Sequence, residues 1–174
     1  MIMDHKLKLM VVDDSPLFRT WLIRSLSEDD RFQVVGYAVN ALDAQEKIPL
    51  LQPDMLTLDI EMPGMSGIDF LKQLLPVHPI PVILVSSLNL RVFDALEAGA
   101  VDFVRKPDEA NGLSKEIFLS MLRSKLMVAA ASHVHLPSAP ADPQAGGIRK
   151  VSSLPPARNT FLQKPKIPLG ASPE

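Results

Sequence analysis

Acidic, hydroxyl and basic side chains follow four apolar runs of this sequence. Asp13 and Asp14 come directly after LKLMVV, and Asp59 comes directly after DMLTL. Ser86 lies at the end of PVILVSS, and Lys106 follows VDFVR. Each residue alone has an ordinary explanation, such as a helix cap, a loop acid or a surface lysine. Together they supply the groups that bind a divalent cation and a phosphoryl group.

The carboxylates predict a magnesium site. Three carboxylates within a few ångströms repel one another, so that without a cation at least one would hold a proton. Magnesium prefers oxygen ligands and keeps several waters beside one or two carboxylates and a phosphate. We expect Asp14 and Asp59 to be direct ligands, together with the backbone carbonyl of Glu61. We expect Asp13 to act through a water molecule.

A phosphoryl group is the substrate that fits the remaining residues. The ammonium of Lys106 suits one phosphoryl oxygen, and the hydroxyl of Ser86 can donate a hydrogen bond to another. Catalysis of phosphoryl transfer is mostly positioning and charge neutralisation. The sequence has no cysteine, and no Ser–His pair comes near the predicted strand ends, so a carboxylate is the expected nucleophile. Asp59 is the candidate because its strand is expected to be central.

The elements that must position these residues alternate along the chain. Strands are expected at 7–12, 32–38, 54–58, 81–87 and 101–105. Helices are expected at 15–26, 41–48, 66–75, 90–100 and about 113–130. Several strands are apolar on both faces, which is typical of a parallel sheet covered by helices on both sides. The pattern predicts a doubly wound α/β fold, in which ligands bind at the carboxyl ends of the strands.

Helix boundaries and apolar positions are also predicted. Ser15 is placed as an N-cap with Pro16 at the first helical position, and the second helix, at 41–48, is expected to stop around Pro49 and Pro53. The buried stripe of the first helix is expected to hold Leu17, Trp21, Leu22 and Ile23. Apolar positions of the last helix are Ile117, Leu119, Met121, Leu122 and Leu126.

The composition changes near residue 132. Residues 132–174 hold 8 of the 16 prolines, and such a segment cannot bury enough apolar surface to fold. We therefore expect one domain over 1–131 and a flexible, disordered Pro-rich tail over 132–174. The domain holds 13 Lys and Arg against 18 Asp and Glu, which disfavours a nucleic-acid partner. Zero cysteines fit a reducing compartment such as the cytoplasm, and no apolar run is long enough to enter a membrane.

Across residues 7–131 the sequence resembles the receiver domain of two-component response regulators. The resemblance implies a flavodoxin-like, five-stranded parallel sheet of strand order 2-1-3-4-5. It implies that a histidine kinase donates a phosphoryl group to Asp59, with magnesium at Asp13, Asp14 and Asp59.

The same resemblance implies three switch features. Ser86 would be a switch hydroxyl, and Phe103 an aromatic switch residue. The peptide between Lys106 and Pro107 would be cis, which is essentially a proline phenomenon and would aim the lysine inward.

Three longer segments are similar to the receiver half of the chemotaxis protein-glutamate methylesterases, the CheB family: LTLDIEMPGMSGIDFLKQLL, PVILVSSL and ALEAGAVDFVRKP. In that family a linker and a serine-hydrolase domain follow, and the phosphorylated receiver relieves inhibition of the hydrolase. The similarity implies a CheA-like kinase as phosphoryl donor, with the chemoreceptor complex as a further candidate partner.

The chain departs from that family at two places. KPKIPLGASPE looks like the start of the esterase domain, and Ser172 falls where its nucleophile would lie. The sequence ends at Glu174, so the residues that activate such a serine are missing and Ser172 is expected to be inert. In addition, only LNLRVFD separates Ser87 from ALEAGA, about one helical turn less than in the family. This shortening affects the segment that would transmit the signal.

Two functions stay open, and two others fit poorly. The chain is either a receiver without a complete esterase domain or the regulatory part of an active methylesterase whose catalytic domain is truncated here. An aspartyl-phosphate hydrolase would carry a second aspartate two residues after the nucleophile, where this chain has Glu61. A dinucleotide-binding domain would need glycines where the chain has DDSP.

Overall fold

The computed structural model describes residues 5–87 and 92–134. Residues 135–174 of the predicted tail, with Ser172, and most of the shortened loop after the fourth strand therefore lie outside the described residues. Within the described part, no helix has both the length and the apolar character needed to cross a bilayer.

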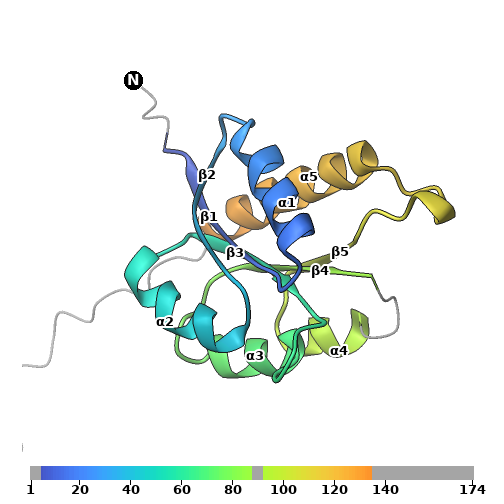
Figure 1. Cartoon of the computed structure of the whole chain (residues 1–174). Helices are drawn as coiled ribbons and strands as arrows, with labels where there is room; N and C mark the ends of the chain where they lie inside the picture. Colours follow the sequence, from blue (N-terminus) through green and yellow to red (C-terminus); the bar gives the residue numbers. More distant parts are fainter. Residues whose placement is uncertain (1–4, 88–91, 135–174) are drawn as a thin grey trace, which may run out of the picture. The chain divides into compact units, whose positions relative to one another are not determined.

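Five parallel strands form one sheet in the order β2-β1-β3-β4-β5, which confirms the predicted doubly wound fold (Figure 1). The strands are β1 (Leu7–Val12), β2 (Phe32–Ala38), β3 (Met55–Asp59), β4 (Val82–Ser86) and β5 (Asp102–Arg105). The helices are α1 (Pro16–Ser27), α2 (Ala41–Leu51), α3 (Gly67–Leu74), α4 (Val92–Glu97) and α5 (Lys115–Val134), with a short 3-10 helix at Glu109–Asn111.

Helices cover both faces of the sheet, as Figure 1 shows, with α1 and α5 on one face and α2, α3 and α4 on the other. Alternate residues of β1 enter the two cores. Met10 and Val12 belong to the core under α2 and α3, whereas Leu9 and Val11 belong to the core under α1 and α5. Burial on both faces explains why the strands read as continuous apolar runs.

Helix α1 begins as predicted but buries a different stripe. The Ser15 hydroxyl accepts the backbone N–H of Phe18, and Pro16 is the first helical residue. Leu17 is 88% exposed, so its predicted burial is wrong. Phe18 packs against the core instead, in line with the buried Leu22 one turn later. The apolar positions at 17, 18, 21 and 22 allowed either stripe, and the packing against α5 selects the second.

Two other helices extend past their predicted ends. Pro49 lies inside the last turn of α2, which continues to Leu51 and ends where Gln52 adopts a left-handed conformation. A proline there removes only one helical hydrogen bond, so the final turn survives. Helix α5 continues to Val134, beyond the expected domain end at 131, because residues 131–134 contain neither proline nor glycine.

Only some of the apolar positions of α5 are buried. Leu122 and Leu126 are fully buried, whereas Ile117 and Met121 are 49% and 42% exposed. Phe118, which the apolar pattern did not single out, is fully buried. Its ring occupies the contact between α5 and α1, where a large side chain fills the space.

Candidate functional site

The register of the sheet brings the predicted site residues to one edge. Val12 of β1 pairs with Leu58 of β3, so the residues that follow them, Asp13 and Asp59, come side by side. On the other side of β3, Ser86 of β4 pairs with the last residue of β5, directly before Lys106. In parallel strands these carboxyl ends point the same way, which explains the convergence.

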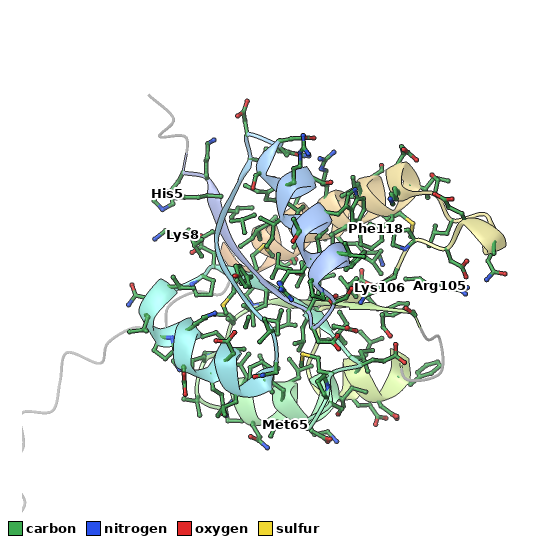
Figure 2. The ribbon with its side chains drawn as sticks, in the orientation of Figure 1. His5, Lys8, Met65, Arg105, Lys106 and Phe118 are labelled. Atoms are coloured by element: carbon green, nitrogen blue, oxygen red, sulfur yellow. The ribbon has the colours of Figure 1, made fainter. Side chains whose placement is uncertain are left out.

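Lys106 joins the two buried carboxylates. Its Nζ lies 2.8 Å from Oδ2 of Asp13 and 3.1 Å from Oδ2 of Asp59. Asp13 is 2% exposed and Asp59 is 3% exposed, so both carboxylates are almost entirely removed from water. Figure 2 shows Lys106 at this edge of the sheet, beside Arg105. The ammonium of Lys106 therefore forms ion pairs with two buried carboxylates.

Further oxygens of Asp13 and Asp59 accept hydrogen bonds from backbone and side-chain donors. The N–H of Ser15 donates to Oδ1 of Asp13 at 2.9 Å, and the N–H of Glu61 donates to Oδ1 of Asp59 at 3.1 Å. The backbone carbonyl of Asp13 accepts a 2.8 Å hydrogen bond from the guanidinium of Arg19. These bonds fix both carboxylates and the turn that follows β1.

The surroundings of Asp59 bring its pKa closer to neutral pH than the pKa of a free carboxyl group. Burial raises the pKa of Asp59 to about 6, Lys106 opposes that rise, and the neighbouring Asp13 adds to it. Burial lowers the pKa of Lys106, but its contacts with Asp13 and Asp59 outweigh burial and leave that pKa above its ordinary value. At neutral pH the site therefore holds an ammonium and an ionised but destabilised Asp59 carboxylate.

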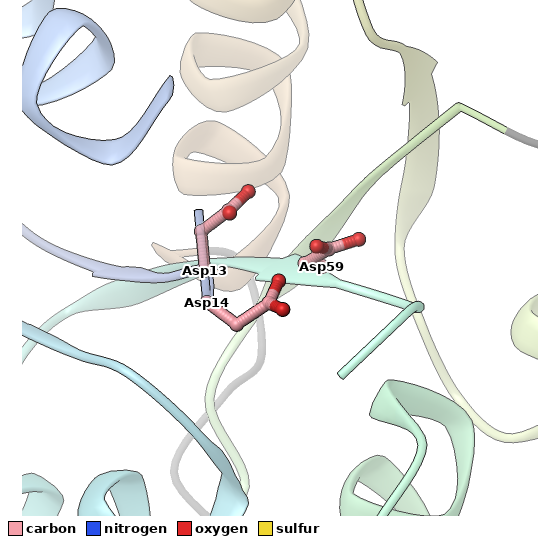
Figure 3. Close-up of side chains that lie close together, drawn as sticks. All are labelled: Asp13, Asp14 and Asp59. Carbon is pink, nitrogen blue, oxygen red and sulfur yellow. The ribbon is translucent and has the colours of Figure 1, made fainter. Parts of the chain in front are cut away.

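Asp14 adds a third carboxylate to this edge. One oxygen from each of Asp13, Asp14 and Asp59 lies within 4.8 Å of the other two. Figure 3 shows the three side chains close together at the ends of β1 and β3. Asp14 is exposed, so the cluster opens toward solvent on its side. Among the described residues, three carboxylates and the ammonium of Lys106 meet here, which leaves an excess of negative charge. Such a donor set fits magnesium.

Ser86 lies where the prediction placed it, at the end of β4 and fully buried. Its backbone carbonyl accepts the N–H of Lys106 at 2.9 Å, so the segment that carries the lysine is tied to β4. Phe103 on β5 is partly buried and packs against the core under α3 and α4. The switch roles of Ser86 and Phe103, and the ligand role of the Glu61 carbonyl, stay predictions.

The predicted cis peptide before Pro107 is wrong. Among the described residues no peptide bond is cis, so the bond between Lys106 and Pro107 is trans. Trans is the ordinary state of most bonds before proline. The lysine nevertheless reaches both carboxylates, at the distances given above, because β5 already carries it to the site edge.

The backbone of Gly67 packs directly against the backbone of Asp59 and Ile60. A Cβ at this position would lie 2.1 Å from the Asp59 carbonyl oxygen and 2.9 Å from Cα of Ile60. The N–H of Gly67 also donates to the carbonyl of Ile60 at 2.8 Å. Only glycine permits so close an approach between the start of α3 and the end of β3.

Phe18 and Arg19 contact the site, although the sequence pattern predicts no site role for either residue. The Lys106 ammonium lies 4.5 Å from the centre of the Phe18 ring, and Arg19 holds the Asp13 carbonyl. The only available signal was their place in the first turn of α1, directly after the predicted ligands. Helix periodicity assigns such residues to packing or to solvent and says nothing of a site at the helix start.

Comparison with known proteins gives the family. Residues 9–118 match the model of the response regulator receiver domain. Over 130 residues the chain is 46% identical to a protein-glutamate methylesterase/protein-glutamine glutaminase of Syntrophomonas wolfei, covering 75% of this chain and 38% of that protein. The chain thus spans less than half the length of this curated relative.

Solved structures agree with this similarity. The response regulator domain of Thermotoga maritima CheB is 36% identical, with a TM-score of 0.65, and the match covers 73% of this chain and 98% of that one. A complex of the P1 domain of CheA3 with CheY6 from R. sphaeroides contains a chain that is 28% identical, with a TM-score of 0.60, covering 72% and 97%. The chain therefore belongs to the response regulator receiver family, and its receiver domain is of the CheB type.

Proposed function

We propose that this receiver accepts a phosphoryl group on Asp59 from a phosphohistidine of a histidine kinase. The observation that carries the proposal is the contact of a 3% exposed Asp59 carboxylate with Lys106 at the carboxyl end of the central strand. The similarity to a CheY6 chain found with a CheA P1 domain supports a CheA-like kinase as donor. The chemoreceptor complex is a further candidate partner.

The transfer step follows from these contacts. An oxygen of the Asp59 carboxylate forms the new P–O bond, the bond between phosphorus and the donor's ring nitrogen breaks, and the imidazole leaves with the electron pair. Lys106 and the N–H of Glu61 favour the ionised carboxylate that this attack requires. The ammonium of Lys106 then neutralises a phosphoryl oxygen, and the Ser86 hydroxyl donates to another.

Magnesium is the cofactor that we propose for the acidic cluster. Asp14 and Asp59 would bind it directly with the Glu61 carbonyl, and Asp13 through water. Its support is the convergence of three carboxylates within 4.8 Å, of which two contact the ammonium of Lys106. Bound magnesium would neutralise the charge that accumulates between the carboxylates and the phosphoryl group.

A second proposal concerns a larger protein in which such a receiver would be joined to an output domain. The relative in Syntrophomonas wolfei is named a protein-glutamate methylesterase/protein-glutamine glutaminase. We infer that this receiver regulates an output of that class where it is joined to one, with Ser86 and Phe103 as the switch residues. A longer reading frame that continues past residue 174 with the hydrolase domain would support this second function.

Intact-mass spectrometry tests the phosphoryl acceptor. The chain is incubated with acetyl phosphate and magnesium beside Asp59→Asn and the control Asp94→Asn, which removes an exposed acid on α4. We expect one phosphoryl adduct on the native chain and on the control, and none on Asp59→Asn. An adduct that persists on Asp59→Asn would mean that another carboxylate is the nucleophile. No adduct on the native chain, under conditions that label other receivers, would contradict the proposal.

A further inference from the structure

The ammonium of Lys106 has a third neighbour besides the two carboxylates. Its Nζ lies 4.5 Å from the centroid of the Phe18 ring, which is within the range of a cation–π contact. The carboxylates of Asp13 and Asp59 lie within 3.1 Å of the same nitrogen. The ammonium is thus held by two charged oxygens and an aromatic face.

The Phe18 ring is itself held firmly. Its backbone N–H donates to the Ser15 hydroxyl, which fixes the residue in the first turn of α1. The ring centroid lies 5.5 Å from that of Trp21 and 5.8 Å from that of Phe118, which meets it edge-on. Phe118 is fully buried in α5. The aromatic cluster of Phe18, Trp21 and Phe118 therefore anchors one side of the lysine's surroundings to two helices.

A lysine at this place needs such a support. Its four-carbon stem is flexible, and its ammonium is a strongly hydrated point charge. Once Asp59 carries a phosphoryl group, the carboxylate oxygen that faces the lysine no longer bears a full charge. The ammonium must then turn to a phosphoryl oxygen without swinging out into solvent. An aromatic face that attracts the cation and excludes water on one side limits that movement.

We propose that Phe18 is a positioning residue for Lys106, keeping its ammonium at the site edge before and after phosphorylation. The proposal rests on the proposed function of Asp59 as phosphoryl acceptor. It assigns to the first turn of α1 a part in the chemistry beyond the cap and core contacts described above. Phe18 touches the lysine and not the reacting atoms.

The first test measures the contact without any phosphoryl donor. The ε-methylene protons of Lys106 should show an upfield ring-current shift in the NMR spectrum of the native chain. Phe18→Leu should remove that shift, whereas Phe18→Tyr should keep it. Phe32→Leu is the matched control, because it removes a buried ring of the same core, at the start of β2, that is not part of the aromatic cluster. Lysine resonances that are the same in Phe18→Leu and the native chain would overturn the proposal.

The second test measures the rate of labelling by acetyl phosphate with magnesium. We expect Phe18→Leu to slow labelling about three- to tenfold, as loss of a partly desolvated cation–π contact predicts. Phe18→Tyr should restore most of the rate, and Phe32→Leu should leave it unchanged at a temperature where all variants are folded. Equal slowing by Phe18→Leu and Phe32→Leu would reduce Phe18 to a packing role. A native chain that is never labelled contradicts the proposed function instead, while the ring-current test still reports on the contact.

Discussion

At the scale of single residues, the site is short of positive charge. Asp13 and Asp59 share the ammonium of Lys106, and the carboxylate of Asp14 lies within 4.8 Å. Burial is the largest cause that raises the pKa of Asp59 to about 6. A carboxylate whose pKa is raised in the fold is less stable there when ionised than in the unfolded chain. Without a cation, Asp59 therefore costs the fold stability at neutral pH.

Replacing this acid should stabilise the metal-free protein. In EDTA at neutral pH we expect Asp59→Asn to raise the free energy of unfolding by about 1–2 kcal/mol, because the amide removes a buried charge of the same sign as Asp13. Urea unfolding measures the effect, with Asp94→Asn as an exposed control expected to change little. A less stable Asp59→Asn would show that the contact with Lys106 outweighs the burial of the charge.

Arg19 should strengthen magnesium binding because its guanidinium holds the backbone carbonyl of Asp13. Its guanidinium donates to the Asp13 carbonyl at 2.8 Å and lies 4.9 Å from the centre of the Tyr37 ring. Arg19→Gln removes this tie, so we expect magnesium to bind about three- to tenfold more weakly, a loss of about 1 kcal/mol. Calorimetric titration gives the affinity. Arg24→Gln is the control, since its 3.9 Å ion pair on the same helix is exposed and distant from the site; an equal loss in both variants would contradict the prediction.

The residues that the sequence could and could not predict differ in a physical way. Asp59 and Lys106 were predictable because strand ends of a parallel sheet must meet at one edge. Phe18 was not, because its role depends on how α1 packs against α5. The trans peptide before Pro107 shows that an expectation carried over from a family can fail where the local backbone reaches the same contact by the ordinary isomer.

At the scale of elements, the close approach of α3 to β3 sets the position of Asp59. Gly67→Ala would place a methyl group 2.1 Å from the Asp59 carbonyl oxygen, and backbone on both sides cannot yield easily. We expect a loss of about 2–4 kcal/mol in stability and slower labelling of Asp59. Chemical denaturation and intact-mass labelling measure the two effects.

Gly64, in the loop directly before α3, provides the matched control. Its φ is +84°, but a Cβ there would meet nothing within 4 Å. Gly64→Ala should therefore lose only about 1–2 kcal/mol from its left-handed backbone, with labelling intact. Similar effects of both substitutions on labelling would mean that loop strain, and not the contact behind Asp59, controls the site.

Element boundaries were predictable where local chemistry decides them and not where packing does. The N-cap at Ser15 confirmed the predicted start of α1. Pro49 did not end α2 because its ring lies in the last turn, where a left-handed Gln52 closes the helix. The exposed Leu17 shows that two adjacent stripes of one helix can look equally apolar until a partner helix selects between them.

At the scale of the whole domain, an ionic cluster on the α1 and α5 side connects distant parts of the chain. Asp29, in the turn after α1, lies 2.7 Å from Nη2 of Arg31 and 3.4 Å from Nε of Arg123 on α5. Arg123 also donates to the carbonyl of Ser25 at 2.7 Å. The hydrogen bond from Arg31 is the largest cause that lowers the pKa of Asp29 to about 2. The ionised form of Asp29 therefore stabilises the turn after α1, with a smaller contribution from Arg123 of α5.

The sign of this effect makes the domain less stable in acid. Because the pKa is about 2 in the fold against 3.8 for a free carboxyl, the stabilisation is complete above about pH 4 and is lost as the pH falls through about 2. After allowance for solvent screening, Asp29→Asn should lower the free energy of unfolding by about 1 kcal/mol at neutral pH. The difference from the native chain should shrink between about pH 4 and pH 2.

Urea unfolding over this pH range measures the effect. Asp30→Asn, which changes a neighbouring exposed acid, is the control and should have a small effect that hardly depends on pH. The comparison distinguishes the ionic cluster from a general response to acid. A difference for Asp29→Asn that did not depend on pH would mean that the side chain acts by packing alone.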